Sequence, residues 1–348
     1  MHAQPLPIQL LDARTNPLAT ADPAAVRALR DTIFGSFRSL ILPALPIADR
    51  VAHRWLTRST SPYIAELDAI AAHTGVSGIY AVNISYEYAC TALARSDAAG
   101  AAPTLRRTLD WPFPGLGRAA ILAHRSGRAG EFFDVTWPGA VGTLTAVAPG
   151  RFAAAINQAP LRRRTRADMF RAIDYTRNLT STLSRERGMP PLHLLRYAFE
   201  TATDFPEALQ LLRTVELARP VLFTLVGCAS GEIAIVERRE RSGTIHLGPG
   251  SVANDWRESQ GGWEPRPCAL PDRRLDSVTR CATIEQAVTS GSKPFSWVIP
   301  PVRNWNTRLA VEMNAGEGWI RVLGYEPRDG ADAAPATLPF ELHTANGG

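Results

Sequence analysis

The sequence predicts an α+β protein in which two packed sheets are covered by helices. Short apolar segments of strand length, separated by turn residues, fill residues 89–157 and return at 221–247 and 307–325. Segments with helical periodicity lie before and after the first group. Runs of strands followed by runs of helices are typical of sheets with helices on their faces. No Pro- or Ser-rich linker divides the 348 residues, so we expect one structural domain.

Residues 1–89 are predicted to be mainly helical after a short extended start. Pro23–Arg30 is rich in Ala and Arg; Ser61-Pro62 places a capping residue and a proline where a helix would begin, and Gly75 lies where it would end. The apolar segment Ile33–Ala48 is broken by an arginine and two prolines and is too short to span a bilayer. A buried helix that ends at a proline is favoured, and a lipid-surface contact or the wall of an acyl pocket is the alternative.

The remaining elements are expected in the order strands, helices, strands. The expected strands are 89–96, 104–111, 119–124, 132–137, 143–148, 152–157, 221–228, 233–238, 244–247, 307–313 and 319–325. The expected helices are 166–183, 191–201, 206–216 and 271–290. The last residues, 328–348, are rich in Ala, Asp and Gly, and we expect a loose tail there.

Composition argues against several classes of protein. The net charge of +5 is small for this length. The basic run 161–166 has neither interleaved aromatic residues nor a nucleic-acid motif, so a solvated loop is favoured over contact with nucleic acid or anionic lipid. The cysteines and histidines show no metal-ligand spacing, and we expect neither a metal nor a cofactor. The N-terminus lacks the regions of a signal peptide, which favours a cytoplasmic location.

Cys90 is the candidate nucleophile. In a hairpin of 89–96 with 104–111, Arg107 and Asp110 return beside it, and a guanidinium lowers the pKa of a thiol. Cleavage after Ala89 would turn the nitrogen of Cys90 into an α-amine. The pKa of such an amine, about 7.7–8.0, suits a general base, and Asp110 would hold it in position. A lone cysteine on a strand is more often a small buried residue, and Arg107 with Asp110 alone would be an ordinary ion pair.

Five elements in one order carry a resemblance to a known family. They are Asn83-Ile84-Ser85-Tyr86-Glu87 with Cys90-Thr91, the R-x-x-D-W element Arg107–Trp111, Gly150–Gln158, Val252–Trp256 and Asp272-Arg273-Arg274. Their order and spacing over residues 8–325 resemble the acid ceramidase and N-acylethanolamine acid amidase family of N-terminal nucleophile (Ntn) hydrolases. More distantly, they are similar to those of the bile-salt hydrolases and penicillin V acylases. No single element is specific, but the five in order are.

This resemblance implies a four-layer α-β-β-α sandwich of two mainly antiparallel sheets. It implies self-cleavage between Ala89 and Cys90, after which the helical chain 1–89 stays bound to the catalytic chain 90–348 as a heterodimer and helps to form the acyl pocket. The implied roles are Cys90 as nucleophile, Asp110 as partner of the amine, and Arg107 and Arg273 around the thiol and substrate. The implied oxyanion hole is the Asn254 side chain and a backbone N–H near Gln158, in the Asn157-Gln158 pair. Without the resemblance, Asn254 would be read as a turn residue.

The chain departs from the family pattern in two places. Asn157-Gln158 stands where acid ceramidase-like proteins have Asn followed by Glu, which puts activation by acid in doubt. The N-terminal cysteine that would link the two chains is missing, so Cys281 is expected to be a free thiol. Cys228 and Cys268 are expected to be structural or incidental.

The leading hypothesis is therefore a cofactor-free amidase that cleaves the linear amide of a small N-acyl compound, such as a ceramide or an N-acylethanolamine, through a thioester on Cys90. A penicillin-type acylase or an acyltransferase on the same scaffold would differ in substrate or acceptor. A non-catalytic protein that binds a lipid surface or a partner would leave the chain uncut, but binding alone does not need the set of Cys, Arg, Asp and Asn residues named above.

Overall fold

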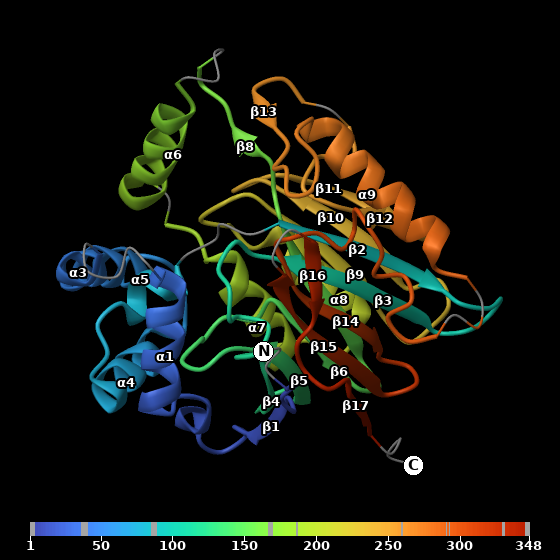
Figure 1. Cartoon of the computed structure of the whole chain (residues 1–348), viewed down its shortest axis with the longest axis horizontal. Coiled ribbons are helices and arrows are strands. Elements are labelled where there is room, and N and C mark those ends of the chain that lie inside the picture. Colours follow the sequence, from blue (N-terminus) through green and yellow to red (C-terminus); the bar gives the residue numbers. More distant parts are fainter. Residues whose placement is uncertain are drawn as a thin grey trace.

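Two β-sheets lie face to face at the centre of the computed structural model (Figure 1). The structure describes residues 4–35, 41–84, 89–165, 170–185, 187–258, 260–289, 291, 293–328 and 331–344. Within these residues one sheet has eight strands in the order β1-β4-β5-β6-β7-β9-β10-β11. The other has seven, in the order β12-β2-β3-β14-β15-β16 with β17 also paired to β15. Apart from β1, which runs parallel to β4, the described strands of both sheets pair antiparallel.

The strand bounds follow the expected segments closely. The larger sheet contains β1 (Gln9–Asp12), β4 (Ile121–Gly127), β5 (Gly130–Thr136), β6 (Thr145–Ala148), β7 (Phe152–Gln158), β9 (Val221–Val226), β10 (Ile233–Arg238) and β11 (Gly243–Leu247). The smaller sheet contains β2 (Ala89–Ser96), β3 (Pro103–Asp110), β12 (Gly250–Val252), β14 (Thr307–Asn314), β15 (Trp319–Arg328), β16 (Ala331–Pro335) and β17 (Phe340–His343). A separate two-stranded ribbon joins β8 (Leu161–Arg162) to β13 (Trp263–Glu264).

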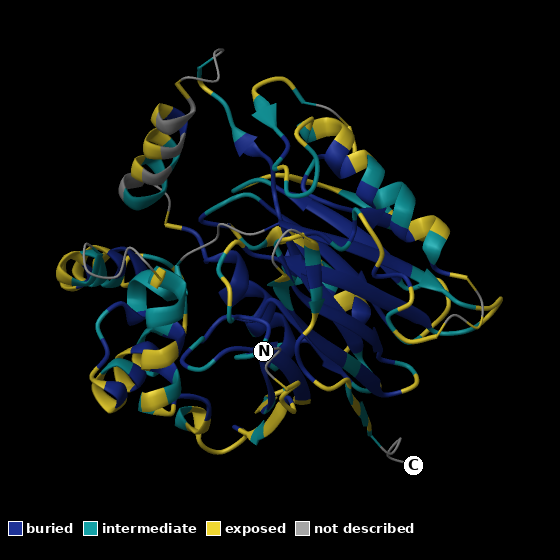
Figure 2. Cartoon of the chain, in the orientation of Figure 1, coloured by how far each residue is buried: buried dark blue, intermediate teal, exposed yellow. Residues whose placement is uncertain are grey.

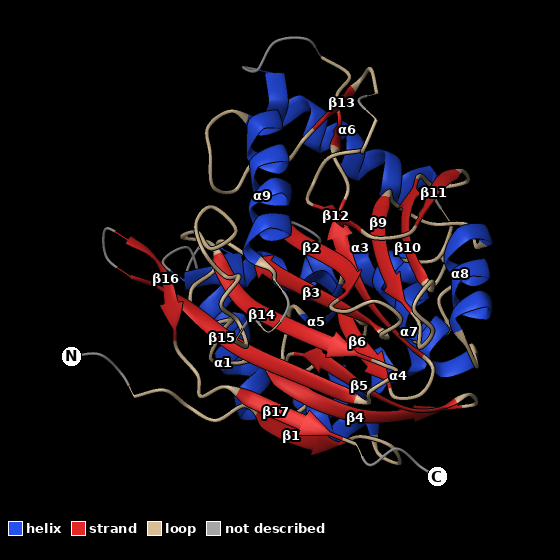
Figure 3. Cartoon of the chain, turned by 90° about the vertical axis from the view of Figure 1, so that its right-hand side faces the viewer, coloured by secondary structure: helices blue, strands red, loops and turns tan. Residues whose placement is uncertain are grey.

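Helices cover the outer face of each sheet. On the larger sheet, α7 (Pro191–Thr201) packs on β4, β5 and β7, and α8 (Phe205–Thr214) packs on β9 and β10. On the smaller sheet, α9 (Arg273–Ala287) lies along β2 and β12, as Figure 3 shows. Strands β2 and β3 face β7 and β9 across the gap between the sheets. The layers are therefore helix, sheet, sheet, helix, and the predicted α-β-β-α sandwich is confirmed.

The core lies between the two sheets, where the buried residues of Figure 2 gather. Every residue of β7 is buried, and so is every residue of β3. Because successive side chains of a strand point to opposite faces, this burial means that each strand is covered on both faces. Cys90, on β2, belongs to the same core and is fully buried.

The N-terminal residues form a group of helices beside the sandwich (Figure 1). The group contains α1 (Pro23–Phe34), α3 (Leu45–Leu56), α4 (Ile64–Thr74), α5 (Ile79–Asn83) and the 3-10 helices η1 (Pro17–Thr20) and η3 (Leu42–Ala44). The prediction of a mainly helical N-terminal part is confirmed for the described residues, although β1 joins the larger sheet. The helix α6 (Arg171–Arg185) stands apart from the sheets, above this group in Figure 1. None of the described helices is long and apolar enough to cross a membrane.

Two expectations about the N-terminal helices were wrong. Helix α4 begins at Ile64, two residues later than a Ser61 cap requires; the Ser61 hydroxyl accepts from the N–H of Tyr63 at 3.2 Å and lies 2.7 Å from Nδ1 of His193 on α7. In the segment Ile33–Ala48, of which residues 36–40 lie outside the described residues, the prolines begin helices instead of ending one. Pro43 lies in η3 and Pro46 in the first turn of α3. A proline fits there because the first helical N–H groups have no partner within the helix. At the other end of α4, Gly75 adopts φ 60° as expected of a helix C-cap.

The expected loose tail is also wrong for the described residues beyond 328. Strand β17 pairs with β15, and β16 pairs with the far end of β15. Phe340 and Leu342 pack against the core from the edge of the smaller sheet. Composition misled the prediction, because an edge strand needs few apolar residues when its backbone is paired on one side.

Candidate active site

The hairpin of β2 and β3 places the predicted residues together. Ala89 pairs with Asp110, Cys90 with Leu109, and Ala92 with Arg107. Because side chains alternate along a strand, Arg107 shares the face of Cys90, which points between the two sheets. Asp110 lies on the other face, toward α9. The site is therefore built on both faces of β2, with the backbone of Cys90 between them.

On the inner face, the thiol of Cys90 meets Arg107. Nη2 of Arg107 donates to Sγ of Cys90 at 2.6 Å and to the carbonyl of Ile156 at 3.1 Å, and the thiol itself lies 3.7 Å from that carbonyl. Nη1 of Arg107 donates to the hydroxyl of Thr145 on β6. Burial raises the pKa of the Cys90 thiol to about 11, although the guanidinium of Arg107 acts in the opposite direction. In the uncut chain the thiol is therefore neutral at physiological pH.

The backbone of Cys90 is held at both of its polar atoms. Its N–H donates to Oδ1 of Asn254 at 2.9 Å, and its carbonyl accepts from Nη1 of Arg280 at 2.6 Å. Asn254 is oriented by a second bond, in which Nδ2 donates to the carbonyl of Gln158 at 2.9 Å. Nδ2 of Asn157 donates to the carbonyls of Val252 and Ala253 and so fixes the loop that carries Asn254. The side chains of Asn157, Asn254 and Arg280 are completely buried.

On the outer face, Asp110 lies among three polar residues. The hydroxyl of Thr307 donates to Oδ1 at 2.8 Å, the thiol of Cys268 donates to Oδ2 at 3.5 Å, and Nη1 of Arg280 lies 3.9 Å from Oδ2. Burial raises the pKa of the Asp110 carboxyl, whereas Arg280 and the hydrogen bonds lower it. Ala89, opposite Asp110, brings the bond between Ala89 and Cys90 to this carboxyl.

The structure does not bring Arg273 to this cluster. Arg273 lies at the start of α9, where Nη1 contacts Oε1 of Glu264, and its side chain is 25 % exposed. Arg280 occupies the site instead, fully buried. It also donates to the Thr91 hydroxyl at 2.8 Å and to Oδ1 of Asn254 at 3.1 Å, and it pairs with Asp276 at 2.8 Å. The expectation that Arg273 lies around the thiol is therefore wrong; among the arginines of α9 it is Arg280 that reaches Cys90, at the backbone carbonyl.

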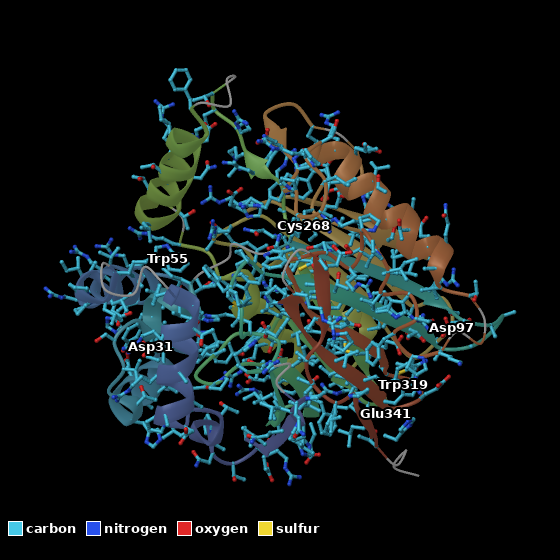
Figure 4. The ribbon with its side chains drawn as sticks, viewed as in Figure 1. Asp31, Trp55, Asp97, Cys268, Trp319 and Glu341 are labelled. Carbon is cyan, nitrogen blue, oxygen red and sulfur yellow. The ribbon has the colours of Figure 1, made fainter. Side chains whose placement is uncertain are left out.

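Sequence reasoning also missed Cys268 and Thr307. The sequence favours a structural or incidental Cys268, but its thiol contacts Asp110; in Figure 4 it lies between α9 and the N-terminal helices that Trp55 and Asp31 mark. Its loop is tied to α9 because Asp276 accepts from the backbone N–H groups of Ala269 and Leu270 at 2.8 Å. No sequence signal marks these residues, because each reaches the site from a distant part of the chain.

The segment before Cys90 is only partly described. Asn83 ends α5, and its side chain bonds with the carbonyl of Gly139 at 3.0 Å and with the N–H of Val141 at 2.8 Å. The rest of the predicted motif, Ser85, Tyr86 and Glu87, lies outside the described residues. Cys228, Cys268 and Cys281 are free, as is Cys90. Among the described residues, no group of three His, Cys, Asp or Glu side chains is placed to hold a metal ion.

Two cavities lie near the site. The first lies between the N-terminal helices and the sandwich and is mainly apolar; its walls include Leu29, Ile33, Trp111, Trp137 and Leu144. Trp111 follows Asp110 along the chain, and Leu144 precedes Thr145, so this apolar cavity begins one residue from the partners of the site. The second lies beyond Gln158 and Ala159.

Comparison with known proteins gives structural similarities only. No family model and no curated protein matches the chain. A Caenorhabditis elegans ortholog of N-acylethanolamine-hydrolyzing acid amidase is 20% identical with a TM-score of 0.48, over 65% of this chain and 93% of that one. Penicillin V acylase from Agrobacterium tumefaciens is 15% identical with a TM-score of 0.39, over 68% and 83%. A mutant conjugated bile acid hydrolase from Clostridium perfringens is 9% identical with a TM-score of 0.41, over 74% and 97%. All three scores lie below 0.5, so the case for a function rests on the residues around Cys90.

Proposed function

We propose that the protein is a self-processing cysteine amidase that hydrolyses the linear amide of an N-acyl compound. One observation carries the proposal: the nitrogen and the sulfur of Cys90 are each held by a side chain. Asn254 Oδ1 lies 2.9 Å from the nitrogen, and Arg107 Nη2 lies 2.6 Å from the sulfur. An N-terminal nucleophile uses these two atoms of one residue as base and nucleophile.

The uncut chain has the features of a silent precursor. Its Cys90 nitrogen is an amide, which cannot serve as a base. The thiol, whose pKa burial raises to about 11, is not ionised at neutral pH. Cleavage between Ala89 and Cys90 would free an α-amine next to Asn254 and Asp110. It would also open the end of β2, where the buried thiol now lies. Cleavage is thus the step that would create both the base and the access.

In the cut enzyme the amine would take the proton of the thiol, and the sulfur would attack the amide carbonyl of the substrate. The tetrahedral oxyanion would be met by Nδ2 of Asn254, which in the uncut chain donates to Gln158. Proton return from the amine to the leaving nitrogen would release the free amine and leave a thioester on Cys90. Water would then add to the thioester, giving the carboxylic acid and restoring the thiol.

The apolar cavity supports an acyl group as one half of the substrate. Its lining is mainly apolar, as in ordinary ligand pockets, and α1 and α5 contribute to its wall. The N-terminal chain would therefore have to remain in place after cleavage, as part of a heterodimer.

Buried contacts support that retention. Arg196 on α7 pairs with Glu66 on α4 at 2.7 Å and with Glu200 at 2.8 Å, and the hydroxyl of Tyr63 donates to Glu200 at 2.7 Å. These groups join the segment before the cut to the chain after it, and their partial burial reduces the screening of their charges by salt. The covalent link at residue 89 is then not needed to keep the two chains together.

Intact-mass spectrometry under denaturing conditions tests the proposal. The purified wild-type protein, incubated over a range of pH, is expected to separate into chains of 89 and 259 residues. Cys90→Ala should remain whole, because it lacks the nucleophile. Cys228→Ala is the matched control, since Cys228 lies outside the site, where its thiol donates to the carbonyl of Arg151.

The cut protein should then release free fatty acid from N-acyl amides, measured by chromatography, whereas Cys90→Ala should not. A wild-type chain that stays intact at every pH would contradict the proposal. So would cleavage of Cys90→Ala at the same bond and rate, because that result would mark an external protease.

A further inference from the structure

Strand β14 contains a bulge directly opposite Asp110. Leu309 pairs with Leu109, and the next pair along is Thr307 with Asp110, so Arg308 is an extra residue on β14. Because side chains alternate along a strand, an unbulged β14 would place Arg308 opposite Asp110 and turn Thr307 to the inner face. The bulge brings Thr307 to the face of Asp110 instead. Bulges beside active sites often re-aim a side chain in this way.

We propose that Thr307 is a positioning residue for the amine of the amidase: its hydroxyl holds the carboxylate of Asp110 so that Oδ2 meets the nitrogen of Cys90. The inference rests on the proposed self-processing function and adds a residue to its machinery. Thr307 does not line either of the two cavities described above, so it would act through Asp110 and not on the substrate.

The hydrogen bonds of Thr307 have a fixed direction. Its Oγ1 accepts from the backbone N–H of Asn304 at 3.0 Å and lies 2.8 Å from Oδ1 of Asp110. Since a backbone N–H can only donate, the hydroxyl proton is directed to the carboxylate. All three residues are buried. Burial raises the pKa of the Asp110 carboxyl, and Arg280 and the hydroxyl of Thr307 act against this rise, which favours the ionised form that binds an ammonium group.

The two oxygens of Asp110 are held unequally. Oδ1 has the short bond from Thr307, whereas the contacts of Oδ2 are longer, 3.5 Å to the thiol of Cys268 and 3.9 Å to Nη1 of Arg280. A thiol is also a weak donor. Oδ2 is therefore the oxygen that can take a further strong donor. Ala89 pairs with Asp110, so the nitrogen that cleavage after Ala89 would free lies beside this carboxylate.

Arg308 keeps the bulge in place. Its side chain is completely buried. Nε donates to the carbonyl of Phe113 at 2.9 Å, and Nη1 donates to the carbonyls of Trp305 at 2.9 Å and Thr307 at 2.8 Å. Thr307 could not return to the inner face without breaking these bonds, and buried charged donors that lose their acceptors are costly. The hydroxyl of Thr307 is thus held at Asp110 by the fold.

The chemistry explains why the carboxylate must be fixed. In self-cleavage the sulfur of Cys90 would bond to the carbonyl carbon of Ala89, and the bond from that carbon to the Cys90 nitrogen would break. The proton lost by the thiol would end on this nitrogen, which becomes an amine next to Oδ2 of Asp110. Water would then add to the thioester, giving the carboxyl group of Ala89 and restoring the thiol. A carboxylate that rotates freely would hold the amine in the productive position less often.

Three variants test the role of the hydroxyl. Thr307→Val replaces it with a methyl group of similar size, and Thr307→Ser keeps it. Thr108→Val is the matched control, two residues from Asp110 on the same face of β3. Thr108 is completely buried, and its hydroxyl has no hydrogen-bond partner in the part of the chain that the structure describes. Urea unfolding shows whether each variant is folded, and intact mass against time gives its rate of self-cleavage.

We expect Thr307→Val to cleave itself about 10- to 100-fold more slowly, because Asp110 loses a hydrogen bond to a charged group. Thr307→Ser and Thr108→Val should stay within about threefold of the wild-type rate, since neither removes that bond. In the fraction of Thr307→Val that is cut, kcat for N-dodecanoylethanolamine should fall by a similar factor, with KM within about twofold. Complete loss of cleavage in a folded Thr307→Val, with Thr307→Ser active, is the limiting form of this result.

Each contrary result has a distinct meaning. Normal cleavage in Thr307→Val would overturn the inference. Equal losses in Thr307→Val and Thr307→Ser would also overturn it, because the packing of the methyl group would then be what matters, and so would an equal loss in Thr108→Val. An effect confined to KM would place Thr307 at the substrate and contradict a positioning role. If the wild-type chain is not cut, or if cut wild-type protein hydrolyses no N-acyl amide, the proposed function itself fails.

Discussion

Arg280 gives the sharpest test of the site. Both Arg273 and Arg280 lie on α9, and replacing each in turn should show which of them self-cleavage needs. Arg280→Gln removes the buried guanidinium that donates to the carbonyl of Cys90, to Thr91 and to Asn254. It leaves Asp276 and Asp110 buried without that positive charge. We expect loss of self-cleavage, with reduced stability of the uncut chain.

The size of the effect follows from the contacts. Removing one partner of a buried ion pair costs about 3–5 kcal/mol of stability, and here the partner is Asp276 at 2.8 Å. A hydrogen bond from a charged donor contributes about 1.5–3 kcal/mol, so losing the one to the Cys90 carbonyl predicts a self-cleavage rate about 10- to 100-fold lower. The double variant Asp276→Asn with Arg280→Gln removes both charges of the pair and should recover part of the stability without recovering the cleavage rate.

Arg273→Gln is the matched control. Arg273 is partly exposed, and its partner Glu264 also has Arg163 at 2.8 Å, so the carboxylate keeps a positive neighbour. Its loss should cost less than about 1 kcal/mol and leave self-cleavage within about twofold. Urea unfolding of the uncut chains gives the stabilities, and intact mass against time gives the rates. Normal cleavage in a folded Arg280→Gln, or its loss in Arg273→Gln, would refute the assignment.

Three further predictions concern the surroundings of the site. Glu66→Gln breaks the partly buried pair with Arg196, so the N-terminal chain should leave the cut protein at a lower urea concentration in size-exclusion chromatography; an unchanged midpoint would show that these contacts do not retain it. Cys268→Ala removes a donor to Asp110 and should slow self-cleavage about two- to tenfold in the mass assay, whereas an unaltered rate would make the thiol incidental. Burial raises the pKa of Asp134 to about 6 from 3.8, so the folded chain binds a proton that the unfolded chain releases. Below about pH 4, protonated Asp134 therefore adds about 3 kcal/mol to the free energy of unfolding, and this contribution is lost as the pH rises through 6. Asp134→Asn should abolish this pH dependence of the free energy of unfolding, measured in urea between pH 4 and 7. The same slope of unfolding free energy against pH in both proteins would disprove the assignment.

Local patterns were enough for most elements of the fold. The hairpin of β2 and β3 combines two runs of strand-forming residues with a turn between them, and its register brought Arg107 and Asp110 to Cys90 as predicted. Alternation along β3 also determined that Arg107 and Asp110, three residues apart, lie on opposite faces. The edge strands β16 and β17 were missed because their residues carry little hydrophobic pattern, and only the folded sheet shows that Phe340 and Leu342 pack against the core.

The sequence by itself determined which residue types meet at the hairpin: a thiol, a guanidinium and a carboxylate, at spacings that a strand pair must bring together. It could not choose between Arg273 and Arg280. Seven residues are close to two helical turns, so both lie on similar faces of α9 and differ by about 10 Å along its axis. Only the docking of α9 against β2 decides which of them reaches the Cys90 carbonyl. The same holds for Cys268 and Thr307, because a contact between residues more than 150 positions apart depends on how the sheets and loops pack and not on any local pattern.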